Sequence, residues 1–323
     1  RLTHMRRTGE ILTRYGDLLE AYQPDPAPVG LLFTPETQVV DWSIHGQATK
    51  MGSAFLRYAR VLERLGIPYD VLESHHLERL DRVKLLIMPE AVTIGPEEER
   101  RLLDFVAVGG KVFFEAWTQA WDDEGIFHYT GKERPFVQAF GLRERCRQSV
   151  GETGGWSEAW QVAIPTGWAV TPWQYEKGTV LGMDANKQPI LVRVPYGAGA
   201  AYALGTWAAF GDDISPAFQP FVAALCRDAE AWPDITVDAG DGMGGVIWRT
   251  GMAGGKRLFF LLNSVVDAVR RVQITLPATY GMRGSWLDLW SGKEVRIRQA
   301  DDKAVSEIEL PPGGLAILLS PTD

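Results

Sequence analysis

Two short, almost unbroken apolar runs that each end in a carboxylate constrain the fold of this chain most. They are Leu85–Glu90 and Val112–Glu115. Continuous rather than alternating hydrophobicity is typical of strands buried on both faces, as in a parallel sheet covered by helices. The segment 96–106 between them opens with proline and acids, and a glycine pair follows at Gly109, as expected of a helix. The three segments therefore predict a βαβ unit.

Further segments extend this unit on its N-terminal side. Residues 29–33 and 69–72 are apolar runs of strand length, and 50–65 has apolar residues on one face at helical spacing. The segment 35–45 is interpreted as a polar loop. The order of elements predicts an α/β domain over residues 28–232, with a doubly wound, mostly parallel sheet.

The rest of the chain is expected to add β structure and a leading helix. A β-rich insertion is predicted at about residues 150–205, where Pro195–Gly199 has the composition of a hairpin turn. Short strands at regular spacing predict a small all-β domain over 233–323, an antiparallel sandwich or barrel, of which we expect the sandwich. Residues 1–27 are interpreted as an amphipathic helix (8–22) and a proline-rich linker. This helix either packs on the domain that follows or is the last element of an upstream one.

Composition excludes several classes of protein. The 323 residues carry a net charge of −8 and a pI near 5.3, which argues against nucleic-acid binding. No apolar run is long enough to cross a bilayer, and no secretory signal is visible, although the start at Arg1 suggests a processed or truncated product. Cys146 and Cys226 lack metal-site spacing, so we expect two unpaired thiols, no metal and no cofactor. A cytoplasmic location is the corresponding expectation.

Acidic and aromatic side chains follow the predicted strands. Ligands of doubly wound sheets bind beyond the carboxyl ends of the strands, where paired carboxylates can act as general acid and base. The alternative is that these charges mark where strands reach solvent, and no spacing singles out one pair. The residues at these ends and in the next loop are Glu36, Glu90, Glu115, Trp117, Trp121, Asp122, Asp123 and Glu124.

Twelve tryptophans are a high number for a chain of this length. Exposed tryptophans suit flat apolar ligands such as sugar rings, and they also suit interfaces; core packing is the alternative for each. The candidate carbohydrate-binding residues are Glu36, Trp42, His45, Glu90, Glu115, Trp117, Trp121 and Asp122. Further tryptophans lie among glycines and prolines at Trp156, Trp160, Trp168 and Trp173.

The order of motifs along the chain resembles the C-terminal part of a known enzyme family. Lys84–Pro89, Val106–Val112 and the acidic turn Asp122–Gly125 are similar to the trimerisation domain of glycoside hydrolase family 42 β-galactosidases. That domain has a class I glutamine-amidotransferase-like fold. Phe260–Asn263 and Leu310–Ala316 resemble the small C-terminal β domain of such hydrolases.

The resemblance implies a non-catalytic structural and oligomerisation module that forms a homotrimer and lines a neighbouring subunit's sugar site. The family's catalytic glutamates lie in an N-terminal (β/α)₈ barrel that is absent here, so no catalytic residue is carried over. The resemblance therefore implies either an upstream catalytic barrel, with galactoside-type sugars, or a homologue that lacks the barrel. Ala116–Thr118 occupies the nucleophile elbow of an amidotransferase without a cysteine, so that activity is not expected. A carbohydrate-binding protein and a stand-alone hydrolase that uses the strand-end carboxylates remain as alternatives.

Overall fold

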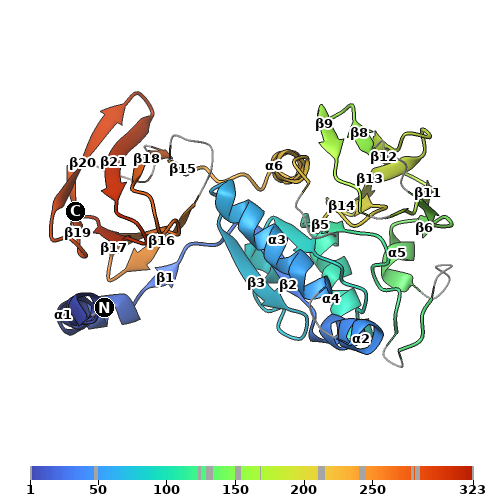
Figure 1. Cartoon of the computed structure of the whole chain (residues 1–323), viewed down its shortest axis with the longest axis horizontal. Helices are drawn as coiled ribbons and strands as arrows, with labels where there is room; N and C mark the ends of the chain where they lie inside the picture. Colours follow the sequence, from blue (N-terminus) through green and yellow to red (C-terminus); the bar gives the residue numbers. More distant parts are fainter. Residues whose placement is uncertain are drawn as a thin grey trace. The chain divides into compact units, whose positions relative to one another are not determined.

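A computed structural model gives the structure of the chain. It describes residues 2–46, 50–122, 125–128, 134–149, 154–167, 169–209, 215–239, 245–277, 280 and 284–321. The chain divides into two compact units, both drawn in Figure 1. Unit 1 comprises Arg1–Pro26, Glu63–Pro68 and Pro233–Asp323, and unit 2 comprises Ala27–Leu62 and Tyr69–Trp232.

Unit 2 is built on one mixed sheet. Its strands are β2 (Val29–Phe33), β3 (Tyr69–Glu73), β4 (Leu85–Met88), β5 (Lys111–Phe114), β8 (Gly155–Ser157), β9 (Val162–Ile164), β12 (Thr179–Met183), β13 (Pro189–Tyr196) and β14 (Gly199–Leu204). They form a nine-stranded sheet in the order β3-β2-β4-β5-β14-β13-β12-β8-β9. From β3 to β14 neighbouring strands are parallel. From β14 to β9 every neighbouring pair is antiparallel.

The expectation of a doubly wound, mostly parallel sheet is wrong. The β-rich stretch expected as an insertion continues the main sheet, because β14 pairs with β5 in parallel and then turns back through β13. Such a tight hairpin can only join antiparallel strands. Strands outweigh helices over the described chain as a whole, and only one section of one sheet is parallel.

The parallel section is covered on both faces, as its continuous apolar runs predict. The helices are α2 (Pro35–His45), α3 (Lys50–Arg64), α4 (Pro96–Ala107), α5 (Pro135–Ala139) and α6 (Phe218–Asp228). Successive residues of β5 point to opposite faces: Phe113 contacts rings of α3 and α6, whereas Phe114 contacts Phe136 and Phe140 beside α4. Two small antiparallel pairs flank the sheet, β6 (Leu142–Glu144) with β11 (Trp173–Tyr175) and β7 (Gln148–Ser149) with β10 (Ala169–Val170).

The interpretation of residues 35–45 as a loop is wrong, because they form helix α2. Pro35 sits in the first turn, and Gly46 ends the helix in the left-handed conformation with a φ of 70°. The buried residues of this helix are Thr37 and Asp41 rather than apolar side chains. An inward-facing apolar stripe, the signal by which amphipathic helices are read from sequence, is therefore missing.

The turn predicted at Pro195–Gly199 does join two strands, since Tyr196 pairs with Gly199 in the β13–β14 hairpin. Gly197 has a φ of 58°, and a Cβ there would lie 2.4 Å from the carbonyl oxygen of Ala107. A Cβ on Gly199 would lie 2.0 Å from the carbonyl oxygen of Gly110. Glycine therefore allows this hairpin to lie against the end of α4.

Unit 1 contains one curled antiparallel sheet. Its strands are β1 (Gln23–Pro24), β15 (Thr236–Asp238), β16 (Val246–Ala253), β17 (Lys256–Asn263), β18 (Arg270–Pro277), β19 (Ser285–Asp288), β20 (Glu294–Ala300), β21 (Lys303–Leu310) and β22 (Leu315–Leu319). They form a nine-stranded sheet in the order β1-β16-β17-β22-β19-β20-β21-β18-β15. Figure 1 shows it bending into a half-barrel. The expected antiparallel sandwich is wrong, because one curved sheet rather than two stacked sheets encloses the core.

The leading helix α1 (Leu2–Glu20) packs on this half-barrel within unit 1. Leu18, Leu19 and neighbouring tyrosines contact apolar side chains of the sheet. Arg7 donates hydrogen bonds to the carbonyls of Trp290 (2.7 Å) and Leu289 (3.0 Å). The helix is thus an N-terminal element of the same unit as the C-terminal strands.

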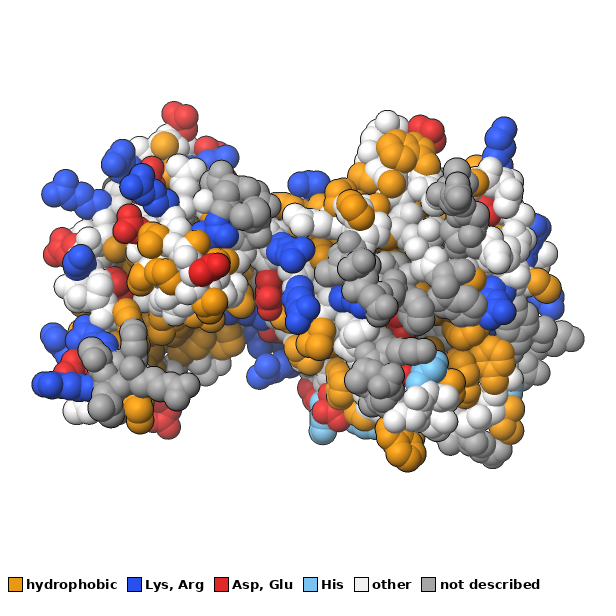
Figure 2. Space-filling model, in the orientation of Figure 1, with side chains coloured by type: hydrophobic (Ala, Val, Ile, Leu, Met, Phe, Trp, Pro, Cys, Tyr) orange, Lys and Arg blue, Asp and Glu red, His pale blue; other side chains and the backbone are white. Residues whose placement is uncertain are grey.

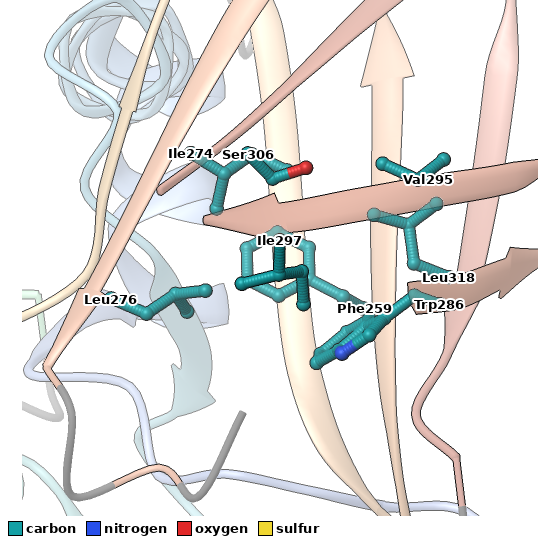
Figure 3. A pocket seen from close by; sticks show the side chains of 8 residues that line it. All are labelled: Phe259, Ile274, Leu276, Trp286, Val295, Ile297, Ser306 and Leu318. Atoms are coloured by element: carbon teal, nitrogen blue, oxygen red, sulfur yellow. The ribbon is translucent and has the colours of Figure 1, made fainter. Parts of the chain in front are cut away.

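A small cavity lies inside the half-barrel (Figure 3). It has a volume of about 10 Å³ and an apolar lining that includes Phe259, Trp286 and Leu318. That volume holds at most about one water molecule, so the cavity is too small for a sugar. None of the described helices has both the length and the apolar character needed to span a bilayer.

Candidate functional site

Two carboxyl groups meet at the carboxyl ends of the adjacent parallel strands β4 and β5. Glu115 is fully buried after β5. Its Oε1 accepts hydrogen bonds from the Tyr58 hydroxyl (2.9 Å) and the Ala208 N–H (2.8 Å), and its Oε2 accepts one from the Glu90 N–H (3.2 Å). Burial raises the pKa of Glu115 to about 7, and the donors oppose this rise.

Glu90 is the member of the pair with fewer hydrogen-bond donors among the described residues. Its Oε1 accepts no hydrogen bond from any residue that the structure describes. Burial raises the pKa of Glu90 well above its usual range, and the charges of Glu115 and Asp41 add to this, whereas Arg57 opposes it. Three donors stabilise the charged form of Glu115, whereas Oε1 of Glu90 lacks a donor among the described residues, so burial of Glu90 favours its protonated form. Its φ of 44° is a strained conformation for a residue other than glycine.

Helix α2 brings a third carboxylate towards this pair. Asp41 is buried and bonds to the Nδ1 of His45, one turn later, at 2.7 Å. Trp42, between them in sequence, is instead exposed. Glu36 at the start of the helix is in separate contacts, with the Nε2 of His75 (2.5 Å) and the hydroxyl of Ser74 (3.4 Å). The hydrogen bond that His75 donates to the Glu36 carboxylate is the main cause of the raised pKa of His75.

Four aromatic side chains form a cluster beside the carboxyl pair, after β5 and β14. We call Trp117, Trp121, Phe127 and Trp207 the aromatic cluster. The ring centroids of Trp117 and Trp207 lie 4.8 Å apart, and those of Trp121 and Phe127 lie 4.4 Å apart. Trp117 also meets Phe127 at 5.4 Å in an edge-to-face geometry that favours aromatic pairs.

A buried ion pair supports the turn that carries Trp117. Trp117 has a φ of 65°, and its N–H donates to Oε1 of Glu144 at 2.8 Å. Arg134 donates to the same oxygen at 2.9 Å and to the carbonyl of Thr118 at 2.8 Å. Asp122 bonds instead to the Nε2 of His128 at 2.7 Å and to a nearby N–H.

The structure brings together only part of the predicted residue set. Glu90, Glu115, Trp117 and Trp121 lie at the carboxyl ends of β4 and β5, as their positions after the strands predict. Both glutamates are buried, so neither carboxyl group presents a surface on which a sugar can pack in this conformation. No group of three or more His, Cys, Asp or Glu side chains in the described part of the chain is arranged to hold a metal ion.

The other predicted tryptophans lie in different surroundings. Trp173 is buried in the main core, and Trp160 packs against Phe221 of α6. Trp156 of β8 is partly exposed beside Met183. Trp168, Asp123 and Glu124 lie outside the described residues.

The amidotransferase-like fold implied by the resemblance is not supported, because the sheet is mixed and the chain is mostly β. The elbow position holds Trp117, which is left-handed like a nucleophile elbow but has no nucleophile. Cys146 and Cys226 form no disulfide, as expected. Cys226 is buried in α6, where burial raises the pKa of its thiol to about 12, so it stays protonated and unreactive.

Sequence reasoning missed several residues that build the site. Trp207 follows β14 and was detectable by the same rule as Trp117, had β14 been assigned to the main sheet. Tyr58, Arg134 and Glu144 carry no such local signal, because they reach the site through contacts between distant segments.

Residues 27–230 match the family model of the β-galactosidase trimerisation domain. The chain belongs to this family. The match covers the mixed sheet, its helices and the whole candidate site, so the site lies inside a β-galactosidase trimerisation domain. No curated protein matches the chain.

Solved structures share the fold over nearly the whole chain. A β-galactosidase from Bacillus circulans sp. alkalophilus superimposes with a TM-score of 0.73 at 19% identity, over 97% of this chain and 44% of that one. A catalytic mutant of a GH42 β-galactosidase from G. stearothermophilus gives 0.70 at 20% identity, over 92% and 41%. An α-L-fucosidase from Paenibacillus thiaminolyticus gives 0.64 at 12% identity, over 96% and 51%. This chain thus spans under half the length of the β-galactosidases, and its fold also occurs with another activity.

Proposed function

We propose that the chain is the non-catalytic, C-terminal part of a β-galactosidase-like glycoside hydrolase and that it holds three subunits together. The observation that carries this proposal is the match of residues 27–230 to a trimerisation domain. Two further features support it. The strand-end glutamates are closed to substrate, and the similar β-galactosidases contain more than twice this length. An attached catalytic domain, galactoside substrates and a cytoplasmic location, which two free thiols favour, belong to the same proposal.

The assembly can be tested on the chain itself. Multi-angle light scattering at micromolar concentration should give a mass of three times 35.8 kDa. Dilution should lower the apparent mass if the contact is reversible, because association depends on concentration. A mass of one chain at all concentrations would contradict the proposed trimer.

Sugar contact is a second candidate function, and the exposure of two aromatic side chains, Trp42 and Phe127, favours it. Both offer ring faces on which a pyranose can pack. The remaining candidates, Glu36, His45, Glu90, Glu115, Trp117, Trp121 and Asp122, would act beside them only where solvent reaches. Calorimetric titration of the assembled protein with galactose and lactose should then show binding heat that Trp42→Ala abolishes. A flat titration of the wild-type protein would exclude this role for the chain.

A further inference from the structure

The surface of helix α2 has the reverse of the usual pattern. Its buried residues are the polar Thr37 and the acidic Asp41. Its apolar residues face outward: Val39 is 67% exposed, Trp42 is 63% exposed and Ile44 is 50% exposed. A helix on the surface of a monomeric protein normally turns its apolar face to the core. We call Val39, Trp42 and Ile44 the α2 apolar patch.

The orientation of α2 is fixed by the polar residues beneath it. Asp41 is buried on the inner side of the helix. There it bonds to His45, and its negative charge contributes to the raised pKa of Glu90. Pro35 and Gly46 fix the two ends of the helix. Rotating the helix to bury Trp42 would expose Asp41 and break this arrangement. The exposed apolar patch is therefore built into the fold.

Helix α4, on the same unit, shows what a solvated helix looks like in this protein. Its outer face is charged, with Arg100 bonded to Glu97 and Asp104 and Arg101 bonded to Glu97. The outer side of α2 from Val39 to Ile44 has no charged side chain. Figure 2 shows hydrophobic side chains at the surface around α2 on the face in view. Exposed apolar patches of this kind mark contact surfaces.

We propose that the α2 apolar patch is part of the surface through which one copy of this chain contacts the next. This inference rests on the proposed trimer and names the surface that forms it. The occupant is a second copy, because the helix lies within the segment 27–230 that matches a trimerisation domain. In a closed ring of three the contact is heterologous, so the patch meets a different surface of the neighbouring copy.

Charge and composition favour a protein partner over a sugar. Each copy carries a net charge of −8, so copies repel one another and associate best through an uncharged surface. Protein interfaces are rich in tryptophan and poor in charge at their centre. The carboxylate adjacent to Trp42 in sequence, Asp41, is buried and bonded to His45, so it does not offer a free acceptor for sugar hydroxyls.

The patch is tested by placing a charge on it and measuring mass. Val39→Glu and Trp42→Glu should each convert the trimer to single chains, because a buried carboxylate without a partner opposes association. The matched control is Val108→Glu, the same substitution after α4 at a residue that is 82% exposed. The control should keep the wild-type mass. Circular dichroism should show that all variants are folded, since all three positions are on the surface.

A milder variant covers the case in which a charged one does not fold. Trp42→Ala should weaken association by about tenfold or more, as for a central interface residue. If both Glu variants still form trimers and Trp42→Ala associates as tightly as the wild type, the α2 apolar patch is not part of the contact. The proposed trimer itself would be unaffected by that result. A wild-type protein that is itself a single chain would overturn both.

Discussion

Replacing Arg134 with methionine should destabilise the chain by about 3–5 kcal/mol, the usual effect of removing one partner of a buried ion pair. The side chains of Arg134 and Glu144 are both almost fully buried, and their charged atoms lie 2.9 Å apart. Without Arg134, the Glu144 carboxylate would stay in the interior, and among the described residues the backbone N–H of Trp117 would be its remaining hydrogen-bond donor. The carbonyl of Thr118 would also lose its donor.

Urea denaturation at one fixed chain concentration measures this effect, because association also contributes to stability. The informative control is Arg134→Met combined with Glu144→Gln. The glutamine carbonyl can still accept from Trp117, but no charge remains buried, so the double variant should recover more than half of the loss. A single variant that costs less than about 1 kcal/mol would show that the pair is solvated like a surface ion pair.

The parallel section of the fold was readable from sequence, because burial on both faces leaves a continuous apolar run. Leu85–Met88 and Lys111–Phe114 are strands near the predicted positions. The direction in which later strands pair was not readable from such runs, since Pro189–Tyr196 is as apolar as a parallel strand. The hairpin turn before Gly199 indicates that the two strands it joins are antiparallel. That both strands belong to the main sheet follows from the pairing of β14 with β5.

The candidate site likewise contains residues that local sequence predicts and residues that only long-range packing brings in. Glu90 and Glu115 were predicted because each directly follows a strand, and parallel neighbours place such residues together. Helix α2 was missed because its inward residues are polar and its apolar residues face outward. Arg134 could not be found, since its partner Glu144 and its role below Trp117 depend on long-range packing.

The stability of the chain should fall as the pH rises from about 4.5 to about 7. In the unfolded chain Glu90 and Glu115 ionise near the ordinary value of 4.5, whereas in the folded chain the pKa of Glu115 is raised to about 7 and that of Glu90 is also raised well above its usual range. The unfolded state therefore binds fewer protons in this range, and stability is lost with rising pH. Glu115 alone can account for roughly 3 kcal/mol at most, at about 1.4 kcal/mol for each unit of pKa.

Glu90→Gln removes the contribution of Glu90 to the pH dependence of stability, because an amide cannot ionise. The variant should have a shallower fall in stability and should exceed the wild type at pH 8. Comparison with the variant is needed since the raised pKa of His75 also makes stability fall as pH rises. The matched control is Glu97→Gln on the surface of α4, where arginines hold the glutamate pKa near 2, so that it should not alter the slope above pH 5. Urea denaturation of the wild type, Glu90→Gln and Glu97→Gln at pH 5, 6, 7 and 8 gives three slopes of stability against pH to compare. Two results would contradict this prediction: a wild-type stability that stays level or rises across this range, or a Glu90→Gln slope equal to that of the wild type. Either would mean that the two carboxyl groups have the same pKa values in the folded chain as in the unfolded chain.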